Sequence, residues 1–168
     1  MQVDQIKELY AYNHWADERL WRTVEGLNEE QLNTDIHNGM GSILTTLLHM
    51  VSAAWIWRIR WQGGMPTSML TIEDFPTSQS ILQSIRARWQ EEEEQLQRFL
   101  TTLQDEDLKG ELRYTRMASP GQVFTQPLWK SMLHLINHQT QHRSEIAMQL
   151  TALNHSPGEL GMGTFFHR

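Results

Sequence analysis

The sequence predicts an all-α protein, a four-helix bundle formed by one domain over residues 1–168. Four segments carry apolar residues at helical spacing, and each is about 20 residues long or longer, as bundle helices are. The apolar fraction of 39% and the charged fraction of 20% are typical of a globular chain that buries a sizeable core. Together these observations favour one helical domain.

The first two predicted helices lie in the N-terminal part of the chain. The first covers Val3–Gly26, where apolar side chains recur every three or four residues. The second covers Ser42–Gln62, because Ser42 is a favourable N-cap and the Gly63–Gly64 pair is typical of a helix end.

The other two helices are separated by a segment of different character. The third predicted helix covers Ser78–Leu103 and follows Pro76–Thr77, while the fourth covers Pro127–Leu153. Between them, Lys109–Gln126 contains two short stretches of strand-forming residues on either side of Ser119–Gly121. This pattern predicts a short hairpin or a long extended loop.

The composition excludes several classes of protein. The sequence has no apolar run of about 18 residues and no signal peptide at its N-terminus, so we expect a cytoplasmic protein that does not bind membranes. It has no cysteine, which excludes disulfides, thiolate metal sites and a cysteine nucleophile. The net charge is −6 and no basic stripe is present, so we expect no nucleic-acid binding.

Three histidines of the fourth predicted helix stand at positions i, i+4 and i+8: His134, His138 and His142. Residues four apart lie on one helix face, so two neighbouring imidazoles there can bind one metal ion. At about 100° per residue, His142 lies roughly 50° from the centre of the apolar stripe, His138 roughly 90° and His134 roughly 130°. The predicted ligands on this helix are therefore His138 and His142, with His134 beside the site or at its rim.

His49 is the predicted third ligand, because it stands in the middle of the strongly apolar second helix. A single histidine on an apolar helix face is more often a hydrogen-bonded core residue than a metal ligand. Its combination with a histidine pair favours a shared metal ion, since burying several neutral imidazoles without partners is costly.

Three neutral histidines leave a divalent ion with open coordination positions, which is typical of a catalytic rather than a structural site. A ligand set without glutamate favours zinc or nickel, with iron, manganese and cobalt as alternatives. Asn13 and Asp17 interrupt the apolar stripe of the first helix at i and i+4. They fit equally a boundary facing solvent and a role in orienting an imidazole or a bound water.

Several motifs resemble the DinB family of YfiT-like metalloenzymes, and the resemblance covers nearly the whole chain. The motifs are Tyr12–Asp17, Gly41–Ile43 followed by Leu48–His49, Asn137–Ile146, and Leu153–Gly158. The resemblance implies a bundle with up-down-down-up connectivity, a metal site on His49, His138 and His142, and frequently a homodimer. The family includes S-transferases that use a thiol cofactor and a thiol-dependent isomerase.

The resemblance favours a metal-dependent enzyme acting on a small molecule. In this interpretation a low-molecular-weight thiol attacks an electrophile at the metal, with Asp17 or His134 as the proton acceptor. A metal-dependent hydrolase and a non-enzymatic metal-binding or stress-response bundle are the alternatives. We also expect a homodimer, because the second helix is apolar nearly all round and the fourth has a second apolar side.

Overall fold

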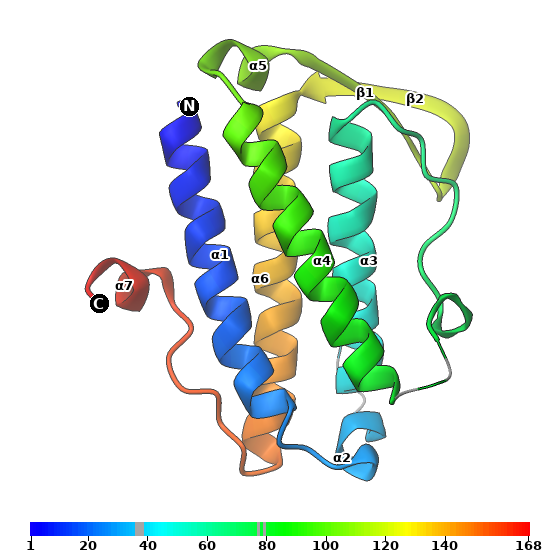
Figure 1. The fold of residues 1–168 in the computed structure, drawn as a ribbon, viewed down its shortest axis with the longest axis vertical. Helices are drawn as coiled ribbons and strands as arrows, with labels where there is room; N and C mark the ends of the chain where they lie inside the picture. Colours follow the sequence, from blue (N-terminus) through cyan, green and yellow to red (C-terminus); the bar gives the residue numbers. More distant parts are fainter. Residues whose placement is uncertain (36–38, 77, 79) are drawn as a thin grey trace.

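The long helices of the protein lie side by side in the computed structural model, which describes residues 1–35, 39–76, 78 and 80–168 (Figure 1). They are α1 (Val3–Val24), α3 (Ile43–Trp61), α4 (Ile81–Thr102) and α6 (Leu128–Ala152). Helices α1 and α6 run in one direction and α3 and α4 in the other. The described chain is thus mostly helical, as predicted.

Shorter elements connect and extend these helices, and the sequence predicted only the hairpin among them. They are α2 (Glu29–Asn33), the 3-10 turn η1 (Ile72–Asp74), α5 (Asp105–Lys109), β1 (Glu111–Arg116), β2 (Ser119–Pro127) and α7 (Met162–Phe166). The two strands form a small antiparallel sheet at the end of the molecule where α3 ends and α6 begins (Figure 1).

The helix starts follow from their N-cap residues. Ser42 accepts a hydrogen bond from the Thr45 backbone N–H at 3.2 Å, which confirms the predicted start of α3. Helix α4 begins at Ile81 rather than at Ser78, because Ser80 provides the N-cap. Residues 77 and 79 of the predicted start lie outside the described residues.

The hairpin has its turn at Met117 and Ala118, earlier than the Ser119–Gly121 segment in which it was predicted. Thr115 pairs with Val123 whereas Arg116 pairs with Ser119, so residues 120–122 bulge from β2. Gly121 has a φ of 82°, a left-handed conformation that glycine adopts without strain. The sequence could not reveal this register shift.

The apolar core consists of two large clusters, one toward each end of the long helices, and a small third cluster between α1 and α7. The cluster near the hairpin contains Tyr10, Trp61 and Leu135, and the opposite one contains Leu20, Leu47 and Ile146. Along α1 and α6, the residues between these clusters include buried polar side chains, whose burial is costly without partners. Across the described residues, no helix combines the length and apolar character required to cross a membrane.

The apolar side chains behind the homodimer expectation are largely covered within one chain. Ile56, Trp57 and Trp61 are buried, with Trp57 against Tyr114 of β1 and Trp61 against Phe99 of α4. These residues need no second copy for their burial, because the hairpin and α4 cover them. The homodimer therefore stays a prediction.

Candidate metal centre

The three predicted metal ligands meet between two adjacent helices. His49 lies on α3, and His138 and His142 lie one turn apart on α6, which packs against α3. Each residue offers one ligand atom, and these atoms all lie within 4.8 Å of one another. The structure thus brings together the residues that the helical spacing selected, as a group that could hold a metal ion.

The separations within this three-histidine group fit a shared ion. His138 Nε2 lies 3.0 Å from His49 Nε2 and 3.2 Å from His142 Nε2. One imidazole nitrogen carries either a hydrogen or a lone pair, so His138 Nε2 cannot make good hydrogen bonds to both neighbours. Nitrogen ligands of a tetrahedral zinc ion lie roughly 3.3 Å apart, given Zn–N distances of about 2.0–2.1 Å.

The protonation of the group also suits a cation. Burial, and then the neighbouring His142, His49 and His134, lower the pKa of His138 to about 3. Burial and His142 lower the pKa of His49. Both imidazoles are therefore neutral near pH 7, and little proton competition opposes metal binding. His138 Nδ1 is buried with no hydrogen-bond partner among the described residues.

A carboxylate that the sequence did not single out orients one ligand. His142 Nδ1 lies 2.8 Å from Oε2 of Glu145, three residues later on the same helix face. This contact holds a proton on Nδ1 and leaves the Nε2 lone pair facing the other histidines, as carboxylates behind metal ligands do. Gly39 approaches the Glu145 carboxylate so closely that a Cβ at this position would overlap it.

Asn13 and Asp17 are buried, so the interpretation that they mark a solvent boundary is wrong. Arg143 Nη1 donates to Asp17 Oδ1 at 2.6 Å and to Asn13 Oδ1 at 3.0 Å, and Asn13 Nδ2 donates to Asp17 Oδ2 at 2.9 Å. Burial raises the pKa of Asp17 to about 6, although Arg143 opposes the shift. Within the described residues, the hydrogen bonds of Asp17 go to Arg143 and Asn13 and none goes to a histidine.

His134 lies beside the three-histidine group. Its ring centroid is 6.1 Å from that of His138, and it packs edge-on against Trp57 at 5.2 Å. Partial burial and then Arg116 lower its pKa, so the imidazole is neutral near pH 7. An exposed neutral imidazole one turn from a ligand can accept a proton from a molecule bound at the site.

Comparison with known proteins establishes the family. The model of the DinB family matches residues 1–165. The chain belongs to the DinB family. A similar solved structure is a DinB-like protein from Bacillus cereus ATCC 10987, with 18% sequence identity and a TM-score of 0.62 over 94% of this chain and 97% of that one. At this identity the likeness shows a shared fold, and the comparison with curated proteins gave no match.

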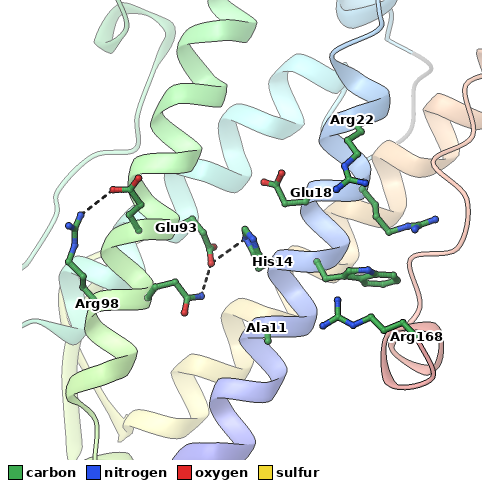
Figure 2. Close-up of a pocket in the computed structure, with 11 residues that line it drawn as sticks. Ala11, His14, Glu18, Arg22, Glu93, Arg98 and Arg168 are labelled. Carbon is green, nitrogen blue, oxygen red and sulfur yellow. Dashed lines mark hydrogen bonds and ion pairs between the residues drawn. The ribbon is translucent and has the colours of Figure 1, made fainter.

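Two cavities of this DinB protein differ in their relation to the histidines. A cavity of about 420 Å³ between α3, α6 and the hairpin includes His134 in its lining. A larger groove of about 850 Å³ lies between α1 and α4 (Figure 2). There His14 Nδ1 lies 3.4 Å from Glu93 Oε1. None of the three predicted ligands lines either cavity, and His134 lines the smaller one alone of the two. The smaller cavity is the one adjacent to the candidate metal centre.

Proposed function

We propose that this protein is a metal-dependent enzyme in which His49, His138 and His142 bind one divalent ion, zinc or nickel, on a four-helix bundle of up-down-down-up connectivity. The observation that carries the proposal is the convergence of three Nε2 atoms that cannot satisfy one another by hydrogen bonds. The Glu145 carboxylate behind His142 is the second support.

The chemistry follows from the neutral ligand set. A divalent ion held by three imidazoles keeps its charge and an open position, and lowers the pKa of a thiol or a water that binds there. We propose that the substrate is a small cellular thiol that attacks an electrophile. The preference for a thiol over water rests on the resemblance to the thiol-dependent members of the family.

His134 is the better supported of the two predicted proton acceptors. Its neutral imidazole is exposed and lies one turn from His138, where it can take the proton that a bound thiol releases. Asp17 already accepts hydrogen bonds from Arg143 and Asn13, which occupy both of its oxygens. We therefore propose His134 as the acceptor and Asp17 as a residue that fixes α1 against α6.

The test is a screen of untagged, metal-loaded protein with several thiols against several electrophiles, beside a panel of esters. We expect thiol-dependent turnover that His138→Ala abolishes and that His167→Ala, an exposed histidine outside the site, leaves unchanged. Activity on esters alone would overturn the thiol proposal in favour of a hydrolase. Inactivity in both panels, with full metal occupancy and no open position by spectroscopy, would favour the non-enzymatic alternative.

We also propose a homodimer, supported by the family resemblance and by the half-buried Trp55, Trp129 and Leu133. Sedimentation velocity at micromolar concentration tests it directly. A single species of the mass of one chain would reject this proposal without affecting the metal site.

A further inference from the structure

The cavity beside the candidate metal centre is lined by residues that follow or precede the predicted ligands on both helices. Ala53 and Trp57 line it on α3, one and two turns after His49, and His134 lines it on α6, one turn before His138. Met117 and Arg116 of the hairpin form the facing wall. Its volume of about 420 Å³ suits a small molecule, and its lining is partly apolar.

The charged side chains that line this cavity are all basic. Arg60 and Arg116 line it, and no acidic residue does so among the described residues. Neither guanidinium has a carboxylate within ion-pair distance in the described part of the chain. By contrast Arg58, two residues before Arg60 on α3, pairs with Glu92 at 2.7 Å. An unpaired pair of cations in a partly enclosed cavity is a site for an anion.

Arg60 is held in place without being neutralised. Its Nη2 donates to the Thr115 carbonyl at 2.6 Å, and its guanidinium lies 5.0 Å from the Trp57 ring centroid and 5.3 Å from that of Tyr114. It is buried, with 7% of its surface exposed. A guanidinium fixed on aromatic rings loses little further entropy when it binds a carboxylate, and its remaining N–H groups stay available.

Arg116 completes the pair from the hairpin. Its guanidinium lies 4.2 Å from the Phe124 ring centroid, and the side chain is exposed at the cavity mouth. Its charge reaches the cavity, since Arg116 lowers the pKa of both Arg60 and His134, in each case after the larger effect of burial. The bulge of β2 sets the strand register at this residue.

We propose that this cavity binds the carboxylate of a small, partly apolar substrate, with Arg60 and Arg116 as the anion-binding residues. That the reactive end of the substrate lies at the three histidines rests on the proposed function. The anion site itself does not depend on it. Trp57, Ile56 and Met69 supply the apolar wall for the body of such a molecule.

Calorimetric titration with hexanoate tests the site, with hexanol and hexylamine as the neutral and cationic probes of equal chain length. We expect binding of hexanoate alone. Arg116→Gln should weaken it by about tenfold or more, since a charge-assisted contact is lost. Arg113→Gln, the same change at an exposed position of the same strand and outside the cavity lining, should change it less than about twofold.

A second variant keeps the test valid if Arg116→Gln weakens binding only because it destabilises the protein. Arg60→Lys keeps the charge and loses the planar fork, and should also weaken hexanoate binding. Equal affinities for hexanoate and hexanol, or an Arg116→Gln affinity equal to that of the wild type, would overturn the proposal. Binding of inorganic phosphate without binding of hexanoate would overturn the assignment to a carboxylate.

The metal-free protein separates this proposal from the proposed function. Hexanoate should bind equally to metal-loaded wild type and to His138→Ala, because the arginines and not the metal hold it. Loss of binding in His138→Ala with Arg116→Gln unaffected would place the anion on the metal, overturning the cavity site while supporting the metal site. Hexanoate binding by a wild-type protein that takes up no metal would support the cavity site and reject the proposed function.

Discussion

Two groups of polar side chains share helix α6, and their hydrogen-bonding needs are met in opposite ways. Arg143 faces α1, where Asp17 and Asn13 accept its hydrogen bonds and bond to each other. His142, the preceding residue, faces α3 and meets imidazoles that cannot all serve as its donors or acceptors. The first group is complete within the chain, and the second is one that a cation could complete.

This difference distinguishes polar side chains that stabilise the fold from polar side chains that are available for a function. A buried ion pair adds little net stability, yet removing one partner is strongly destabilising because the other charge stays buried. A cluster of neutral imidazoles loses much less when one member is removed, because no buried charge remains. The predictions below use this contrast, from the largest expected effect to the smallest.

The largest effect is expected for the metal content of His138→Ala. Wild type should bind about one ion per chain and His138→Ala almost none, because His138 Nε2 lies between the other two ligands. Elemental analysis of untagged protein measures this. At a free metal concentration about 1,000-fold above Kd, the ion should stabilise the wild type by about 4 kcal/mol. EDTA should therefore lower the melting temperature of wild type and leave that of the variant unchanged.

Metal content that is equal in wild type and in a His49→Ala, His142→Ala double variant would contradict the site. His14→Ala, in the groove of Figure 2, is the matched control and should retain the metal.

Arg143→Met should have the opposite signature. It removes the cation and leaves Asp17 buried without its ion-pair partner, so the free energy of unfolding should fall by about 3–5 kcal/mol. Metal stoichiometry should remain near one, because Arg143 faces away from the ligands. Urea unfolding of the metal-free protein, followed by tryptophan fluorescence, gives the first quantity. A loss of metal without a loss of stability would reverse the roles assigned to the two groups.

Glu145→Gln should weaken metal binding by about 10–100-fold, because the amide no longer holds the proton on His142 Nδ1 as a carboxylate does. Competition with a chromophoric chelator measures the affinity. Glu8→Gln, the same change at an exposed position of α1, is the control. An affinity of Glu145→Gln equal to that of the control would show that the carboxylate does not tune the ligand.

The residues that the sequence predicted are those fixed by position on one helix. Helical periodicity identified the long helices, the inward pair His138 and His142, and the isolated His49. Partners across helices were missed, because the contact of Asp17 with Arg143 depends on how α1 packs against α6. Glu145 was within reach, since a carboxylate three residues after a predicted ligand lies on the same helix face. The packing of Tyr114 on Trp57 depends on the register of the two strands, which cannot be predicted from a local sequence pattern.

The two groups should also respond to acid with opposite signs in the metal-free protein. The pKa values of His49 and His138 are lowered in the folded state, so the unfolded chain takes up protons first below about pH 6.5 and stability falls as pH falls. The pKa of Asp17 is raised to about 6, so between about pH 6 and 4 the folded chain takes up a proton first and stability rises as pH falls.

Variants isolate the two contributions. Between pH 6.5 and 4, His138→Ala should lose less stability than wild type, and Asp17→Asn should lose more, whatever its stability at neutral pH. After allowance for the partial exposure of His138, the loss of unfolding free energy over this pH range should differ from that of the wild type by on the order of 1 kcal/mol. Urea unfolding at several pH values in the presence of EDTA measures it. Parallel curves of unfolding free energy against pH for the three proteins would mean that neither the pKa of His138 nor that of Asp17 is shifted in the folded state. A steeper loss of stability in His138→Ala would mean that the His138 imidazole of the wild type is charged in the folded state. A metal ligand beside two other histidines should be neutral there.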